Sequence, residues 1–275
     1  MALIHVDFFS RVLGKETHAT VMLPSFSNTY YMTTPQEALF DPGRRFKTLT
    51  LLHGFSQNET SWQRFSSAER YAERYGLAIV CPDGNNGHYT DWAVGPQNLT
   101  FLQEEFLPAL RTMFPLSPRQ EDNFVGGLSM GGYGAFKWAF TYPDTFSHVI
   151  NFSGGVDIRP RIEFYKFHLD PRQMEQVFGP LDQVPDGPHD VFRLIRDVKK
   201  SGHPLPRIFS CSGTEDKAGF MNHTNLLKVL EEVQADVTVY TAPGHHDFWF
   251  WDEALKKVIS EWLPLTDLHE GLDLP

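Results

Sequence analysis

The sequence has little cysteine, a deficit of positive charge and no long apolar run. Its two cysteines in 275 residues are too few for a disulfide-stapled fold. Both Cys81 and Cys211 end β-like runs, which predicts small buried residues rather than a disulfide. No stretch reaches the roughly 18 apolar residues of a membrane span. The N-terminal residues 1–24 lack the apolar core of a signal peptide, so we expect a cytoplasmic protein with no membrane partner.

The balance of charge also limits which molecules the protein can bind. Lys and Arg number 24 against 34 Asp and Glu, for a formal net charge of −10, and basic residues form no run longer than a pair. Such a surface repels polyanions, which argues against nucleic acid as a partner. With 41% hydrophobic and 21% charged residues, the composition is that of a globular protein with a substantial core.

What the sequence does contain is an alternation of short β-rich runs with helix-period segments. Such alternation predicts an α/β fold with a mainly parallel central sheet of about eight strands and helices on both faces. Two β-like runs precede any helix, so we expect them to form an antiparallel edge hairpin. The segment Arg159–Gly202 interrupts the rhythm and is predicted to be a short helical cap insertion within one domain spanning residues 1–275.

A single serine lies inside the glycine-rich stretch GGLSMGGYG. Residues 127–131 read Gly-x-Ser-x-Gly, a pattern that chance alone would place in roughly one chain in ten of this length. Here it follows a β-like run and opens a helix-period segment, the setting of a nucleophile elbow. Gly127, Gly131 and Gly132 would provide the space that this turn needs. A glycine-rich helix N-terminus capped by Ser129 is the alternative.

A serine nucleophile needs a base and an acid that orients the base. In this architecture the chain order is nucleophile, acid, histidine. Downstream of Ser129, one β-like run opens into Glu215 and Asp216, and the next opens into His245 and His246. Both pairs lie beyond the carboxyl ends of strands, where an open α/β sheet gathers its site. The alternatives to catalytic roles are structural: Asp216 would be a turn or N-cap aspartate, and His246 would be a loop histidine.

Two backbone N–H groups are expected to bind the oxyanion. One is that of Met130, directly after the nucleophile, and the other is that of Phe55 in the His-Gly turn after an earlier strand. His53 has no proton-transfer role in this scheme and is expected to brace the loop.

The assembled motifs resemble the tributyrin esterase branch of the esterase D-like α/β hydrolases. The resemblance runs from near Thr50 to Trp251, through LLHGFSQNETSW, PDGNNGHYTDW, GGLSMGGYGAFKWA, HVINFSGG, FGPLDQVPDGPHDVFRLI, SGTED and PGHHDFWFW. It implies an α/β-hydrolase fold with Ser129 as nucleophile, Asp216 as acid and His246 as base. Members of the family have an acidic and an aromatic residue after the histidine, which selects His246 over His245.

The same resemblance implies a carboxylesterase that hydrolyses short-chain acyl esters, acetyl to butyryl, and that needs no cofactor or metal. It also implies a homo-oligomer, either a dimer or a tetramer. The loop NNGHYTDW is expected to line the pocket, with Tyr89 and Asp91 near the substrate or in a structural role. Core packing is expected for most of the aromatic cluster Trp249–Trp251.

Two alternatives to the carboxylesterase stay open. One is a thioesterase of the S-formylglutathione hydrolase type. Those enzymes have a motif similar to His-Gly-Leu-Thr-Cys at the position where this chain has HGFSQ. The other is a binding or scaffold protein without turnover, which the chemically competent triad disfavours.

Overall fold

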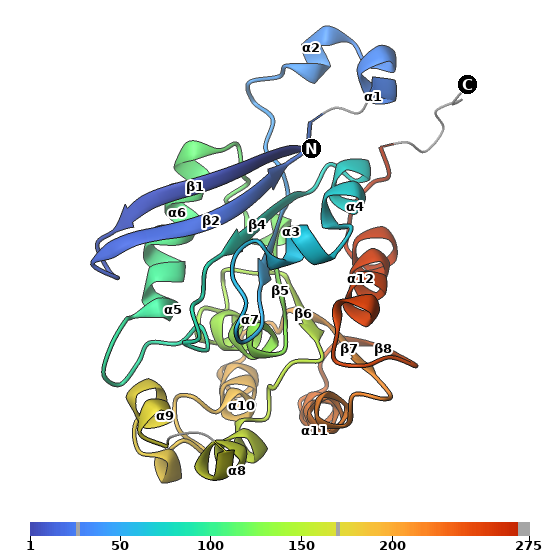
Figure 1. Ribbon diagram of the computed structural model, residues 1–275. Helices are drawn as coiled ribbons and strands as arrows, with labels where there is room; N and C mark the ends of the chain where they lie inside the picture. The colour runs from blue at the N-terminus through green and yellow to red at the C-terminus, as the bar shows by residue number, and fades with distance from the viewer. Residues whose placement is uncertain (26–27, 169–170, 269–275) are drawn as a thin grey trace.

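A single sheet of eight strands is formed by the described residues, which are 1–25, 28–168 and 171–268 of the computed structural model (Figure 1). The strand order is β1-β2-β4-β3-β5-β6-β7-β8. All pairs from β4 to β8 are parallel, whereas β1 pairs antiparallel with β2, and β2 with β4. The parallel sheet and its antiparallel edge hairpin are therefore confirmed. The strands are β1 (Ala2–Ser10), β2 (Lys15–Leu23), β3 (Thr48–Leu52), β4 (Ala78–Pro82), β5 (Asn123–Leu128), β6 (His148–Phe152), β7 (Arg207–Gly213) and β8 (Val237–Ala242).

The central strands are continuously apolar because helices cover both faces of the sheet. Every residue of β3, β4, β5 and β6 is buried, as expected for parallel strands with no solvent-facing side. Strand β8 lies at the edge and is only partly buried. Cys81 in β4 and Cys211 in β7 are both buried.

Two helical layers enclose the sheet. The buried cluster on one face includes residues of α6, α7, α10 and α11, and the cluster on the other face includes residues of α3, α4 and α12. No helix in the described ranges is long and apolar enough to cross a bilayer. The helices are α1 (Asn28–Thr33), α2 (Gln36–Leu39), α3 (Ser61–Phe65), α4 (Ala68–Arg74), α5 (Asn98–Phe101), η1 (Leu102–Phe106), α6 (Leu107–Met113), η2 (Gln120–Asp122), α7 (Met130–Thr141), α8 (Ile158–His168), α9 (Pro171–Phe178), η3 (Leu181–Gln183), α10 (Val191–Ser201), α11 (Lys217–Glu232), α12 (Phe248–Lys257) and η4 (Val258–Trp262).

The segment between β6 and β7 is helical, but not all of it is an insertion. Helix α10 packs against α7 and α11, so it is the crossover helix that returns the chain from β6 to β7. Helices α8 and α9 lie beyond this layer, at the lower left of Figure 1. The insertion expected over 159–202 is thus confined to the part before α10, of which residues 169–170 lie outside the described ranges.

Candidate active site

Ser129 occupies a strained turn between β5 and α7. Its backbone has φ 52° and ψ −113°, a left-handed conformation that a residue with a side chain adopts only at a cost of about 1–3 kcal/mol. The turn is held because the Ser129 N–H donates to the Phe152 carbonyl at 3.1 Å, and the Gly132 N–H donates to the Ser129 carbonyl at 3.1 Å. The strand–turn–helix setting of a nucleophile elbow is present.

The glycines around Ser129 are required by close backbone approach. A Cβ atom at Gly127 would lie 2.2 Å from the Gly131 carbonyl oxygen, and one at Gly131 would lie 2.3 Å from the Leu52 carbonyl oxygen. A Cβ at Gly132 would lie 2.6 Å from the Cα of Gly154. These contacts are with backbone atoms, so no side-chain rearrangement relieves them. The expected need for space at the three glycines is confirmed.

Asp216 and His246 form a short hydrogen-bonded pair. The Asp216 carboxyl, at the N-terminus of α11, accepts from the Gly219 N–H at 2.9 Å through Oδ1, and its Oδ2 lies 2.5 Å from His246 Nδ1. Burial alone would raise the pKa of Asp216, but the hydrogen bonds from His246 and Gly219 outweigh burial and hold the pKa below its ordinary value. Asp216 is thus an N-cap and a histidine partner at once. An ionised carboxylate there keeps the proton on Nδ1 and leaves Nε2 free to act as a base.

Ser153 and Trp251 hold the pair from behind. The Trp251 indole lies edge-on to the His246 ring, with centroids 4.9 Å apart, and its Nε1–H donates to Ser153 Oγ at 3.2 Å. A hydrogen bond from Ser153 also favours the ionised form of Asp216. Ser153 is buried and has a φ of 48°, so this second strained serine is fixed beside the first at the carboxyl edge of the sheet.

Ser129 and His246 share one pocket. It has a volume of about 310 Å³, and its remaining lining residues are Gly54, Phe55, Gln57, Leu128, Asp247, Phe248 and Trp251. Asp216 lies behind His246 and does not line the pocket. A substrate in the pocket would therefore meet the serine and the imidazole, with the carboxylate shielded from it.

Both expected oxyanion donors lie beside the pocket. Phe55 lines it, and Met130 follows Ser129 as the first residue of α7. Within the described part of the chain, neither amide donates to a protein acceptor, whereas the neighbouring Gly54 N–H is taken by Gln57 Oε1 at 3.0 Å. The amides of Phe55 and Met130 are therefore available to a ligand, and their binding of an oxyanion stays a prediction.

His53 braces the loop that carries Phe55. It is 1% exposed, its Nδ1 lies 2.8 Å from the Gly54 carbonyl oxygen, and its Nε2 accepts from the Gly84 N–H at 2.9 Å. The imidazole therefore ties the loop after β3 to the loop after β4, which agrees with the bracing role expected for it.

Tyr89 and Asp91 do not face the pocket, and the expectation that they lie near a substrate is corrected. Tyr89 is fully buried and donates its hydroxyl proton to the His53 carbonyl at 3.1 Å. Asp91 accepts from the Thr100 N–H at 2.9 Å and from the Thr100 hydroxyl at 2.7 Å. Both side chains support the loops behind the site, the structural role that was their alternative.

His245 is also separate from the catalytic arrangement. It is 70% exposed and forms an ion pair with Glu215 at 3.1 Å on the surface. The two neighbours in sequence, Glu215 and Asp216, thus pair with the neighbours His245 and His246, and of these four residues only His246 lines the pocket.

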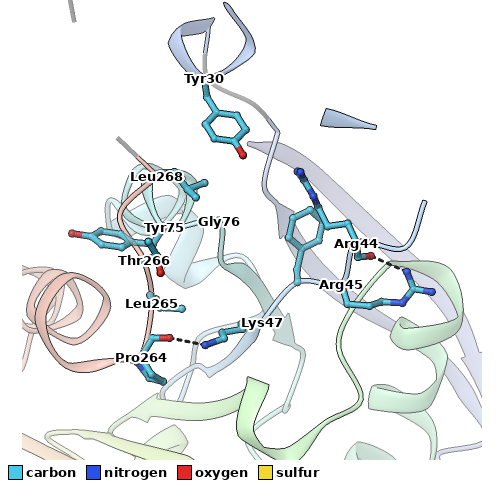
Figure 2. A pocket seen from close by; sticks show the side chains of 11 residues that line it. Tyr30, Arg44, Arg45, Lys47, Tyr75, Gly76, Pro264, Leu265, Thr266 and Leu268 are labelled. Atoms are coloured by element: carbon cyan, nitrogen blue, oxygen red, sulfur yellow. Dashed lines mark hydrogen bonds between the residues drawn. The ribbon is translucent and has the colours of Figure 1, made fainter. Parts of the chain in front are cut away.

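A second cavity lies at the opposite edge of the sheet, before the first residues of β3 and β4. Figure 2 shows its cluster of cationic side chains, and its volume is about 330 Å³. Their charged groups bind backbone carbonyls: Lys47 Nζ donates to Pro264 at 2.6 Å and Arg45 to Arg44 at 2.8 Å. Lys47 thereby fastens the segment after η4 to the start of β3, and none of the candidate catalytic residues lines the cavity.

The comparisons with known proteins agree with this geometry. Residues 10–260 match the family model described as "Putative esterase". The chain belongs to this esterase family. The esterase is 27% identical to an acetyl esterase of Caldicellulosiruptor saccharolyticus over 271 residues, covering 96% of this chain and 98% of the relative. The family makes it a carboxylic ester hydrolase.

Solved structures resemble the esterase over nearly their whole length. The substrate-bound serine hydrolase FphF of Staphylococcus aureus superposes with a TM-score of 0.83 at 27% identity, covering 95% of this chain and 98% of that one. The S-formylglutathione hydrolase FrmB of the same organism superposes with a TM-score of 0.80 at 28% identity, with the same coverage.

Sequence reasoning missed the support behind the esterase's acid and base. Ser153 follows β6 at the carboxyl edge of the sheet, where the other site residues also gather, and this position was the available signal. Trp251 belongs to an aromatic cluster expected mainly to pack in the core. Phe250 and Trp251 are each 3% exposed, but Trp249 is 87% exposed.

Proposed function

We propose that the esterase is a serine carboxylesterase of the tributyrin esterase branch, acting on short-chain acyl esters from acetyl to butyryl. The observation that carries the proposal is the Asp216–His246 pair, 2.5 Å apart, in a site that shares its pocket with the strained Ser129. The volume of about 310 Å³ lies at the low end of the roughly 300–1,000 Å³ of small-molecule sites, which favours a small acyl group.

The first half-reaction forms an acyl-enzyme. His246 Nε2 takes the proton of the Ser129 hydroxyl while Ser129 Oγ attacks the ester carbonyl carbon. The amides of Phe55 and Met130 stabilise the negative charge that develops on the carbonyl oxygen. Asp216 stabilises the imidazolium that forms. The C–O bond to the alcohol then breaks as His246 returns the proton to the leaving oxygen.

The second half-reaction repeats these steps with water. His246 removes a proton from water, the hydroxide attacks the acyl carbon, and the Ser129 oxygen leaves with the proton that His246 returns. The carboxylic acid is released and the enzyme is regenerated. Each residue thus plays the same part twice, which the fixed Asp216–His246 geometry permits.

A thioesterase of the S-formylglutathione hydrolase type is the second candidate. The likeness to FrmB favours it, because the same triad would cleave a thioester by the same two steps. The leaving group distinguishes the two candidates. The HGFSQ loop, which departs from the His-Gly-Leu-Thr-Cys of those enzymes, favours the oxygen ester.

The test compares kcat/KM for p-nitrophenyl acetate and S-formylglutathione, with Ser129→Ala as the blank. We expect the oxygen ester to be preferred and the variant to lose several orders of magnitude in kcat while keeping its fold, which circular dichroism checks. A strong preference for the thioester would move the protein to the second candidate. Wild-type activity in Ser129→Ala would refute the mechanism.

A cytoplasmic location and a homo-oligomeric state, dimer or tetramer, are part of the same proposal. They derive from the sequence and its family resemblance. Fractionation of the source cells and sedimentation of the purified protein would test them separately from the chemistry.

A further inference from the structure

Asn151 is a fully buried polar residue that the mechanism does not use. It lies in β6, where it pairs with Gly127 of β5 and Ser210 of β7. Strand β5 leads to Ser129 and strand β7 leads to Asp216, so Asn151 lies between the nucleophile and the acid. A buried amide costs free energy unless its polar atoms are paired, and its partners therefore indicate what it does.

The oxygen of the Asn151 side chain caps the turn that follows β6. Oδ1 accepts from the Gly154 N–H at 2.8 Å. A Cβ atom at Gly154 would lie 2.2 Å from this oxygen, and one at Gly132 in α7 would lie 2.8 Å from it. The amide is therefore packed closely between this turn and the first turn of the helix that begins after Ser129.

The turn of residues 153–155 contacts both the nucleophile and the acid. At one end, the Gly155 N–H donates to the Ser129 carbonyl at 3.1 Å. At the other end, the Ser153 hydroxyl forms a hydrogen bond with Asp216. The buried amide binds the middle residue of this turn, so a shift of the turn would displace the partners at both of its ends.

Two further buried side chains hold the nitrogen of the same amide. Asn151 Nδ2 donates to Ser210 Oγ at 3.0 Å, and Ser210 Oγ lies 2.8 Å from Nδ1 of His223 in α11. His223 Nε2 has no hydrogen-bond partner within the described ranges. The contact with Ser210 is therefore the one that sets the tautomer of His223.

Donors and acceptors along this chain of side chains run in one direction. A backbone N–H can only donate, so Asn151 must turn its oxygen to Gly154 and its nitrogen to Ser210. Ser210 accepts from this nitrogen and has its own proton to donate to His223 Nδ1. Burial lowers the pKa of His223 to about 4, so the ring is neutral near pH 7 and can accept. The chain thus fixes which way round the amide lies.

We propose that Asn151 is a positioning residue for catalysis: oriented by Ser210 and His223, its amide holds the turn of residues 153–155 where the turn aligns the nucleophile with the acid. Asn151 acts through the turn and touches no substrate, since neither it, Ser210 nor His223 lines the catalytic pocket. This inference rests on the proposed carboxylesterase function and adds a residue to its machinery.

The experiment removes or keeps the contacts of this amide. Asn151→Leu has nearly the same shape but loses both contacts. Asn151→Asp keeps one oxygen for the Gly154 N–H and a second for Ser210, whose hydroxyl can donate to it or accept from it. Ser210→Ala leaves the bond to Gly154 but breaks the link to His223.

Asn123→Leu is the matched control. Asn123 is also a buried asparagine of the sheet, 2% exposed, and its side chain donates to the carbonyls of Ser117 and Arg119 at 2.9 Å and 2.6 Å. It is the first residue of β5, at the edge of the sheet opposite the active site. This variant therefore shows what the loss of a buried amide does to stability alone.

kcat and KM for p-nitrophenyl acetate are measured at a temperature at which circular dichroism shows each variant to be folded. We expect Asn151→Leu to lower kcat and kcat/KM together by about 10- to 100-fold, because a misplacement of about 1 Å can cost 10² in rate. Asn151→Asp should restore most of this loss, Ser210→Ala should lower kcat severalfold, and Asn123→Leu should lower the melting temperature with a wild-type kcat.

Three results would overturn the positioning role: a kcat within about threefold of wild type in Asn151→Leu, an equal loss of kcat in Asn123→Leu, or an equal loss in Asn151→Asp. If Asn151→Leu does not fold, Ser210→Ala decides. A lower kcat at unchanged KM would then support the role, and an unchanged kcat would overturn it.

The two proposals fail in different ways. A wild-type kcat in Asn151→Leu, together with no hydrolysis by Ser129→Ala, overturns the positioning role and leaves the esterase mechanism standing. Hydrolysis that survives in Ser129→Ala overturns the mechanism itself.

Discussion

Replacing Asp216 by asparagine separates its two roles, because the amide can perform only one of them. The asparagine oxygen can still accept from the Gly219 N–H, the bond that caps α11 at 2.9 Å. Its amide nitrogen is a donor and would face His246 Nδ1, now 2.5 Å from a carboxylate oxygen. Nδ1 must then become the acceptor, so the proton moves to Nε2 and the imidazole cannot deprotonate Ser129.

The expected magnitudes differ for activity and stability. In a serine triad, holding the imidazole in the wrong tautomer costs roughly 10⁴ in kcat, which is about 5 kcal/mol of barrier. Asparagine caps a helix about as well as aspartate, so the melting temperature of Asp216→Asn should stay near the wild-type value. Asp216→Ala removes the cap as well, costing about 1 kcal/mol of stability and roughly 2–4 °C in a chain of this size.

The assay therefore pairs kcat for p-nitrophenyl acetate with thermal unfolding for both variants. We expect similar losses of kcat in the two and a lower melting temperature only in Asp216→Ala. A kcat within tenfold of wild type in Asp216→Asn would show that this carboxylate does not set the tautomer, and the assignment of acid and base would then be wrong.

Three further predictions follow from the geometry. Gly131→Ala should destabilise the fold by about 1–3 kcal/mol or more in urea unfolding, since its Cβ would lie 2.3 Å from the Leu52 carbonyl oxygen; unchanged stability would contradict the close approach. Ser153→Ala should lower kcat severalfold with little change in KM, because the hydroxyl supports Asp216 and Trp251; a loss confined to KM would argue against this support. Burial lowers the pKa of His88 to about 3, so the unfolded chain takes up this proton below about pH 6.5 and the native state does not. From this residue, the free energy of unfolding should therefore decrease by about 1.4 kcal/mol for each unit by which the pH is lowered from about 6.5 to about 3. A His88→Phe variant should show a weaker dependence of this free energy on pH.

The sheet and the triad could be predicted from the sequence because their signals are local. The central parallel strands are continuous apolar runs, and each chemically active residue lies shortly after the end of a parallel strand. Ser129 follows β5, Asp216 follows β7 and His246 follows β8. Since parallel strands place their carboxyl ends along one edge, order along the chain was enough to bring the three residues together.

What could not be predicted depends on contacts between distant segments. Whether Tyr89 faces a substrate or the core is decided by Gly84 and Gly134, where an added Cβ would meet its ring, and no local pattern shows this packing. The link from Trp251 through Ser153 to Asp216 likewise joins α12 to the segments that follow β6 and β7. The sequence predicts α10 as part of the insertion, because the spacing of its apolar residues shows that it has a buried face but not that this face packs on α7.

The position of β8 at the edge of the sheet makes enzyme activity a strict measure of complete folding. Strand β8 pairs only with β7 in the described sheet, and the loop after it carries His246. Ser129, in contrast, lies on a turn that interior strands hold. A chain in which β8 came away from β7 would therefore keep its nucleophile in place without the base that activates it.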